Sequence, residues 1–364
     1  MATSMPKPEL SGNEMRTLLG LVKYPTLNDR QLSERIGIKM STVTAIKNRL
    51  KDQGYFMTVR VPKLQRLGAE LLSVSYAQTD PSLPEEPRLE VGRRVLESFD
   101  ETFYIGAGPR YRFSMGMHRN YTTARATLDG VLRLYSQNRL LVPDMYNVVL
   151  FPFDSTRVLN FFDYSQLLER AFGMDLPPRE EGGRRAVGGT GFEGVSTVAL
   201  SPIEAKVLKG LIFNPDLLDS NIAKVIDVTR QTVTKMRKKF TEEDLFFTVR
   251  VPNLKLLGFE MVAFIHTTYL PSSTLESRQE AVAPVLGTLP LVFKAESGLD
   301  GVEIVATRGY GEFAAYYDAL DARLRDTQAI GKEPTVLLFT LEEFQTVKNH
   351  VYTPCLSRVV DRPA

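Results

Sequence analysis

The chain has 364 residues, a formal net charge of +2, 43% hydrophobic and 24% charged residues. This length suits two to four domains, and the composition is typical of a soluble globular protein. No apolar run approaches the about 18 residues of a membrane span, and the N-terminus lacks the apolar segment of a secretion signal. The single cysteine, Cys355, excludes an intrachain disulfide. We therefore expect a cytoplasmic protein that makes no membrane contact.

An internal repeat organises the chain. Residues 56–64 recur as residues 246–254, at an offset of 190, with the shared core Thr-Val-Arg-Val-Pro. The match continues without a gap on both sides, and about one position in three is identical between residues 10–71 and 200–261. The period is far too long for a solenoid unit. Each copy is therefore predicted to be a domain or a pair of domains.

The first part of each copy is predicted to be a winged helix-turn-helix. Apolar residues at three- and four-residue spacing predict helices over residues 10–23, 29–36 and 41–54. Gly37 supplies the tight turn between the second and third helix, and Ser41 is predicted to cap the third. An alternating, β-branched segment at residues 56–61 then predicts a wing strand. Three short helices with a glycine turn are the helix-turn-helix pattern.

The second part of each copy is predicted to be a ferredoxin-like β-α-β-β-α-β unit. In copy 1 the predicted elements are strand 71–79, helix 88–98, strands 102–105 and 111–118, helix 121–135 and strand 145–151. In copy 2 they are strand 261–269, helix 275–286, strands 291–295 and 302–307, helix 313–324 and strand 335–341. The expected fold class is α+β. The expected domains are winged helices at 8–68 and 198–258, ferredoxin-like domains at 69–172 and 259–364, and a flexible Gly/Pro-rich linker at 173–197.

The third helix of each winged helix is basic and contains no acidic residue over the part predicted to contact DNA. Small polar groups and amides on its exposed face suit base edges in the major groove, and flanking Lys and Arg suit phosphates. The candidate DNA-binding residues of copy 1 are Ser41, Thr44, Lys47, Asn48, Arg49, Lys51 and, pointing outward from the wing, Arg60. Those of copy 2 are Arg230, Gln231, Thr234, Lys235, Arg237, Lys238, Lys239 and the wing residue Arg250.

Two simpler interpretations stand beside DNA binding. A basic exposed helix face is often only solvated surface, and winged helices also serve as protein-interaction scaffolds. The repeated Thr-Val-Arg-Val-Pro is explained by packing of its valines and by the exit that proline sets from the wing. Three histidines and one cysteine show no metal-ligand spacing, so neither a metal nor another cofactor is expected.

The order of elements resembles the Lrp/AsnC (feast/famine) family of prokaryotic regulators, twice over nearly the whole chain. The residues that carry it are 29–38 with 41–54, then 58–68 leading into 71–79, and their counterparts in copy 2. The resemblance implies double-stranded DNA as partner, ligand domains that pair through their sheets, and small effectors, often amino acids, near the hairpin. Only the second hairpin, residues 297–301, retains a Gly and an Asp. No effector-binding residue is assigned.

These features predict a transcription regulator that is not an enzyme. One chain would act as a pseudo-dimer, and its two winged helices, which differ in their exposed residues, would bind an asymmetric operator. Whole chains are free to associate further.

A second family with the same two-module plan offers an alternative. The siroheme decarboxylases resemble this chain in layout and use His and Arg side chains on a tetrapyrrole. Arg112 and His118 share one strand face by period 2 and are the place to look for such a site. In the matching strand only Arg308, just past its end, aligns with His118 at the offset of 190. His266 and His350 are expected to be structural.

Overall fold

The computed structural model describes residues 10–80, 98–179, 196–282 and 289–361, together with 86, 90–92 and 94. Its residues fall into two compact units, and neither unit follows the boundaries of one repeat. Unit 1 comprises residues 1–58, 158–189 and 248–342, and unit 2 comprises residues 59–157, 190–247 and 343–364. Each unit therefore combines the helices of one repeat with the sheet of the other.

The winged helix of copy 1 lies in unit 1 and has the three predicted helices. They are α1 (Gly12–Lys23), α2 (Asp29–Ile36) and α3 (Met40–Asp52). Gly37 ends α2 in the left-handed region, with φ of 69°, as the predicted tight turn requires. Ser41 is not the cap of α3, because that helix already begins at Met40 and its N-cap residue makes no side-chain hydrogen bond.

The winged helix of copy 2 lies in unit 2 and repeats this arrangement. Its helices are α7 (Pro202–Phe213), α8 (Asp219–Val225) and α9 (Arg230–Glu242). Asp227 takes the place of Gly37 and also adopts positive φ, 51°. The predicted wing strands are β1 (Phe56–Pro62) and β7 (Phe246–Pro252), which form a two-stranded sheet. The chain passes between the two units within each of these strands.

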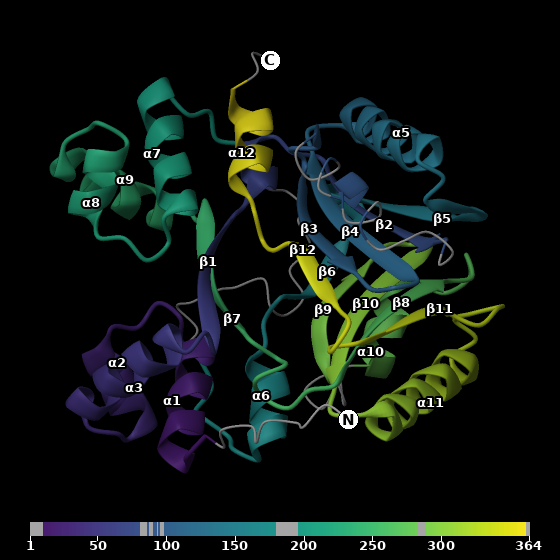
Figure 1. Cartoon of the computed structure of the whole chain (residues 1–364), viewed down its shortest axis with the longest axis horizontal. Helices are drawn as coiled ribbons and strands as arrows, with labels where there is room; N and C mark the ends of the chain where they lie inside the picture. Colours follow the sequence, from purple (N-terminus) through teal and green to yellow (C-terminus); the bar gives the residue numbers. More distant parts are fainter. Residues whose placement is uncertain are drawn as a thin grey trace. The chain divides into compact units, whose positions relative to one another are not determined.

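The five-stranded sheet of unit 2 has the order β12-β3-β4-β2-β5. Four of its strands are the predicted ferredoxin-like set of copy 1, and helix α5 (Tyr121–Gln137) packs against them. These strands are β2 (Leu71–Thr79), β3 (Thr102–Ala107), β4 (Tyr111–His118) and β5 (Leu141–Pro152). The fifth, β12 (Gln345–Lys348), comes from the end of copy 2 and pairs antiparallel with β3 (Figure 1).

The sheet of unit 1 has the equivalent order, β11-β8-β10-β9-β6. Its copy-2 strands are β8 (Met261–Thr268), β9 (Leu291–Glu296), β10 (Asp300–Thr307) and β11 (Thr335–Thr340). Helix α11 (Tyr310–Asp326) covers the apolar core of this unit, which also contains α10 (Leu275–Val282). The fifth strand, β6 (Arg157–Phe161), comes from the end of copy 1. The two copies thus exchange their last strands, which the sequence pattern did not predict.

Each exchanged strand leads into a helix that packs on the winged helix of its own unit. The short helix η2 (Phe153–Ser155), at the end of the unit 2 segment, precedes β6; in unit 1, α6 (Ser165–Phe172) then packs against α1. In unit 2, α12 (Thr353–Val360) packs against α7, as Figure 1 shows at the yellow end of the chain. The short helix η1 (Leu64–Leu67) follows the wing in unit 2 and also contacts α12.

The α+β fold class and the order of elements are confirmed. Most of the predicted helix 88–98, the end of the predicted helix 275–286 and residues 180–195 of the predicted linker lie outside the described residues. No helix in the described ranges is long and apolar enough to cross a membrane.

Candidate functional site

The predicted reading face of α3 is tied to its own winged helix by acids on the neighbouring helices. In unit 1, the Thr44 hydroxyl donates to Asp29 at 2.7 Å, and the Lys47 ammonium pairs with the same carboxylate. Burial raises the pKa of Asp29, but the hydrogen bonds from Lys47 and Thr44 outweigh burial and hold that pKa below its usual value. Arg49 pairs with Glu14 of α1 at 2.5 Å. Three of the candidate DNA contacts are therefore engaged within the domain.

Helix α9 of unit 2 has the same ties at equivalent positions. Thr234 donates to Asp219 at 2.8 Å, and Arg237 pairs with that carboxylate. Lys239 pairs with Glu204 at 2.5 Å, and its hydrogen bond is the main cause that lowers the pKa of Glu204 to about 2. The ties of the two copies correspond at the offset of 190, so these shared residues have a structural role in both winged helices.

The remaining candidates on these helices are exposed. On α3 they are Ser41, Asn48 and Lys51, and on α9 they are Arg230, Gln231, Lys235 and Lys238. Lys238 is 3.8 Å from Glu242 one turn away, in a pair that is largely exposed and therefore weak. Arg230, Gln231 and Lys235 make no side-chain interaction with the part of the chain that the structure describes. The free positive charge of α9 is thus concentrated at its N-terminal half.

The prediction that Arg60 and Arg250 point outward from the wings is wrong. Arg60 is only 7% exposed, and its guanidinium donates to the carbonyls of Leu211 and Pro215 at 2.7 and 2.8 Å, all within unit 2. Burial lowers the pKa of Arg60 to about 10. In unit 1 Arg250 donates to the carbonyl of Leu21 at 3.0 Å.

The physical reason for both contacts is the same. The last carbonyls of a helix have no partner in the helix, and a cation near its C-terminus satisfies them. Both arginines serve the first helix of a winged helix in this way.

A second group of polar residues lies on one face of β4, inside unit 2. Arg112, Ser114, Gly116 and His118 alternate along this face, as period 2 predicts. Ser114 and Ser75 of β2 are joined by a hydrogen bond of 2.7 Å. A cavity of about 20 Å3, room for about one water molecule, is lined by Arg112 and Ser114 of this face together with residues of β2, β3, α5 and β5.

Arg112 has no carboxylate partner among the described residues. Its Nη1 donates to the Tyr135 hydroxyl at 2.9 Å, and its guanidinium lies 5.0 Å from the centre of that ring. Its Nε is buried without a hydrogen-bond partner in the described structure. Nearby, burial raises the pKa of Tyr146 to about 12, so this hydroxyl keeps its proton. A half-buried guanidinium whose Nε is unpaired, close to tyrosine and serine hydroxyls, suits the binding of a carboxylate.

His118 lies at the opposite end of β4 from Arg112. The two residues are six positions apart, which corresponds to about 20 Å along a strand. They therefore share one face of the strand but are too far apart to act on the same substrate atom. His118 is 1% exposed, its Nε2 is 2.7 Å from Ser73 Oγ, and burial lowers its pKa to about 4. The backbone packs closely here, because a Cβ on Gly116 would lie 3.0 Å from that Nε2. Burial thus favours the neutral form of His118, and its Nδ1 has no hydrogen-bond partner among the described residues.

The matching interior of unit 1 holds a charged cluster that the sequence patterns did not indicate. Lys294 of β9 pairs with Glu303 of β10 and with Glu296 at 2.9 Å, and all three side chains are buried. Tyr316 donates to Glu303, and Tyr269 donates to Glu296 at 3.1 Å. The signal was present, since charged residues at inward positions of an apolar strand need such partners.

The strand register also corrects an alignment. Leu71 pairs with His118 in unit 2 and Met261 pairs with Thr307 in unit 1, so His118 corresponds to Thr307 rather than to Arg308. His266 pairs with Asp300 at 2.9 Å, and His350 is buried beside Tyr352. No cluster of three or more metal-ligating side chains occurs in the ranges that the structure describes.

Solved structures with a similar fold include an enzyme. Siroheme decarboxylase NirDL, in complex with an iron-uroporphyrin III analogue, is 11% identical over 96% of this chain and 99% of its own, with a TM-score of 0.50. AsnC of E. coli is 16% identical over 39% of this chain and 93% of its own, with a TM-score of 0.31. An AsnC family regulator from Agrobacterium tumefaciens is 12% identical over 39% of this chain and 90% of its own, with a TM-score of 0.32. No family model and no curated protein matches the chain.

The likeness to NirDL shows that the fold of this chain is the Lrp/AsnC-like two-module fold along nearly its full length. It also corrects the prediction that the chain is not an enzyme. That prediction assumed that a chain with two winged helices and two ferredoxin-like domains is a regulator. An enzyme has the same plan from end to end, so the plan is no argument against catalysis.

Proposed function

We propose that the chain is an enzyme of the siroheme-decarboxylase kind, which removes a carboxylate from an anionic tetrapyrrole. The observation that carries the proposal is the half-buried Arg112 side chain, whose buried Nε has no hydrogen-bond partner and which has no acid partner among the described residues. The likeness to NirDL supports the scaffold. The cavity beside Arg112 is about the size of one water molecule, too small for a macrocycle, so in this proposal only the carboxylate end of a substrate side chain approaches Arg112.

The residues around Arg112 suit decarboxylation. In this reaction the bond from carbon to the carboxylate breaks, carbon dioxide leaves, and the carbon takes up a proton. Arg112 would bind and orient the carboxylate, while the dry surroundings weaken its solvation. Tyr135 and Tyr146 both line this cavity, and burial raises the pKa of Tyr146 to about 12, so the Tyr146 hydroxyl is the candidate proton donor.

Incubation of the full chain with siroheme, followed by absorbance and mass spectrometry, tests this proposal. We expect loss of carbon dioxide from the substrate, and a decrease of about tenfold to a hundredfold in kcat/KM for Arg112→Met, because one charge-assisted hydrogen bond is worth about 1.5–3 kcal/mol. Arg110→Met is the matched control, since Arg110 is exposed just before β4. Absence of both turnover and siroheme binding in folded protein would rule the proposal out.

A second candidate is DNA binding by the winged helices, which the exposed and unpaired Arg230, Gln231 and Lys235 favour. The double variant Arg230→Gln/Lys235→Gln should reduce the log–log salt slope of duplex binding by about 0.9 for each phosphate that the helix no longer binds. Arg237→Gln is the contrasting variant: Arg237 is tied to Asp219, so this substitution should lower stability more than the slope. An unchanged slope in the double variant would exclude this surface.

A further inference from the structure

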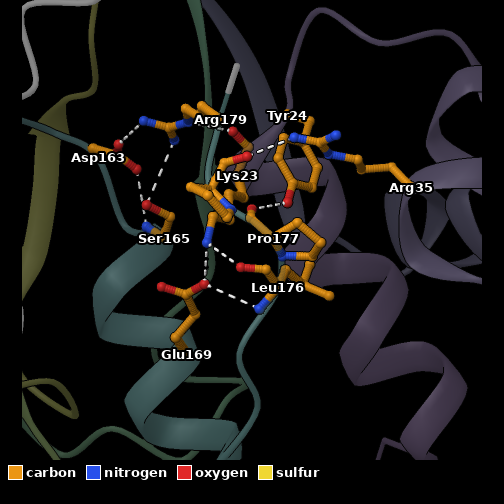
Figure 2. A network of polar contacts seen from close by, with 10 residues as sticks. Lys23, Tyr24, Arg35, Asp163, Ser165, Glu169, Leu176, Pro177 and Arg179 are labelled. Atoms are coloured by element: carbon orange, nitrogen blue, oxygen red, sulfur yellow. Dashed lines mark hydrogen bonds and ion pairs between the residues drawn. The ribbon is translucent and has the colours of Figure 1, made fainter. Parts of the chain in front are cut away.

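The segment that follows α6 is held against the winged helix of unit 1. We call residues 173–179 the strap. Figure 2 shows three side chains of the winged helix that donate to successive strap carbonyls. Lys23 Nζ donates to Leu176 at 2.8 Å, the Tyr24 hydroxyl donates to Pro177, and Arg35 Nη2 donates to Pro178 at 2.5 Å. The strap is thus recognised as an extended peptide, mostly through its backbone.

Helix α6 and the strap's own last residue complete this binding site. Glu169 of α6 pairs with Lys23 and accepts from the Leu176 amide at 3.3 Å. Arg179 donates to the Lys23 carbonyl at 2.6 Å and pairs with Asp163 at 2.5 Å (Figure 2). The Leu176 side chain is 6% exposed, so the strap also buries an apolar anchor. In unit 1 the surface between the winged helix and α6 is therefore a peptide-binding groove that is already filled.

Unit 2 has the same groove, and none of the residues that the structure describes fills it. Helix α12 corresponds to α6, and it packs on α7 as α6 packs on α1. The cavity between α7 and α12 measures about 530 Å3, within the range of ligand sites. We call it the α7–α12 groove. Its lining includes Ala205, Lys206, Gly210, Phe213, Val225 and Val360.

The residues that hold the strap are replaced in this groove. At the offset of 190, Lys23, Tyr24 and Arg35 become Phe213, Asn214 and Val225. The amide of Asn214 is already used, because it donates to the Gly210 carbonyl at 3.1 Å. Phe213 and Val225 are 69% and 62% exposed, which is unusual for side chains of their size. The side chains that bind strap carbonyls in unit 1 are thus replaced by exposed apolar side chains in the α7–α12 groove.

The groove also has a charged rim. Lys209 pairs with Asp361 of the segment after α12, whereas Lys206 is exposed and makes no side-chain interaction with the described part of the chain. An anionic group on the occupant would complement Lys206. The strap itself combines these chemical features, because Asp175 directly precedes Leu176, Pro177 and Pro178.

We propose that the α7–α12 groove is a docking site for an extended segment of a partner protein, with apolar and proline residues against Phe213 and Val225 and an acid facing Lys206. The occupant lies where the strap lies in the equivalent groove of unit 1. Proline lowers the entropy cost of binding an extended segment. The groove contains no residue of the polar site around Arg112, so this inference does not depend on the proposed function.

A synthetic peptide of residues 174–179, acetylated and fluorescently labelled, is the probe. Fluorescence anisotropy with the full chain should show saturable binding. Phe213→Asp and Val225→Asp should each weaken it at least tenfold, because they place a charge on the apolar floor. Lys206→Gln should weaken it a few-fold and reduce its salt dependence. Leu218→Asp is the matched control: Leu218 is 72% exposed in the same domain but does not line the groove, so binding should not change.

The side chains of Phe213 and Val225 lie on the surface, so the variants at these positions should fold. Circular dichroism checks that they do. No saturable binding at millimolar peptide, or equal weakening in Leu218→Asp and Phe213→Asp, would overturn the proposal. Sedimentation of the whole chain gives a further outcome. If wild-type protein is a dimer that Phe213→Asp dissociates, the occupant is a second copy of the chain, and docking of a partner protein is wrong.

Discussion

At the scale of single residues, several residues that are identical in the two copies make internal contacts. Asp29 and Asp219 hold a threonine and a cation of the next helix, and the wing arginines hold helix carbonyls. The sequence showed that the third helices are basic. It could not show that acids from neighbouring helices reach those cations, because that depends on the angles at which the helices pack.

His350 offers a test of buried charge at this scale. It occupies in unit 2 the place that Phe162 has in unit 1, and the two share a positive φ, 54° and 55°. Its ring lies beside Tyr104 and Tyr352, and burial lowers its pKa to about 3. Below a pH of about 6.5 the unfolded chain binds a proton that the native His350 does not bind. Stability should therefore decrease as the pH falls, by about 1.4 kcal/mol per unit between about 6.5 and 3.

The variant His350→Phe should remove this dependence and keep the backbone, as Phe162 does in the other copy. Urea unfolding at pH 7.5 and 5.5 measures it. Between pH 7.5 and pH 5.5, the free energy of unfolding of the variant should rise by about 1.4 kcal/mol relative to that of the wild type. If the difference in unfolding free energy between the two proteins is the same at both pH values, His350 titrates normally in the native state.

At the scale of elements, the winged-helix helices, α5, α11, the wings and eight of the sheet strands followed from periodicity, whereas helices α6 and α12 were not predicted. Strands β6 and β12 did not, because they are short edge strands and local pattern does not say which sheet a strand joins. The candidate site was predicted only in part. The face that carries Arg112 follows from alternation along the strand, but the lack of a carboxylate near Arg112 among the described residues and the pairing of Lys294 depend on tertiary contacts.

Two glycines of α1 should respond oppositely to the same substitution. A Cβ on Gly20 would lie 2.7 Å from Ile36 Cγ2, whereas a Cβ on Gly12 meets no heavy atom within 4 Å. Gly12→Ala should stabilise the domain by about 0.5–1 kcal/mol, because alanine restricts the unfolded chain. Gly20→Ala should instead destabilise it by about 1–3 kcal/mol through overpacking against α2.

Thermal and urea unfolding of the two glycine variants measure these effects. Gly210→Ala extends the test to unit 2, where the Cβ would lie 2.9 Å from Ile226 Cγ2. If Gly20→Ala is as stable as Gly12→Ala, then α1 and α2 do not pack as closely as described.

At the scale of the whole molecule, the exchange of strands makes the two repeats interdependent. Each unit contains chain from both halves of the sequence: β6 and α6 of copy 1 lie in unit 1 with β8–β11, and β12 and α12 of copy 2 lie in unit 2 with β2–β5. A half-chain therefore lacks an edge strand for its own sheet and carries one that fits the other. Unpaired edges of this kind favour association or aggregation.

We therefore expect residues 1–179 and 196–364, expressed separately, to be unstable alone and to associate when mixed in equal amounts. The mixed fragments should regain the circular dichroism of the whole chain, and size-exclusion chromatography should show a 1:1 complex. Hydrogen exchange gives the sharper signal, because the β3 amides that pair with β12 should gain protection only in the mixture. Shortening the first fragment to residues 1–156 removes β6 and α6, which should weaken association without changing β2–β5. If both fragments are soluble monomers that do not associate when mixed, each copy completes its own sheet. The exchange of last strands would then be wrong.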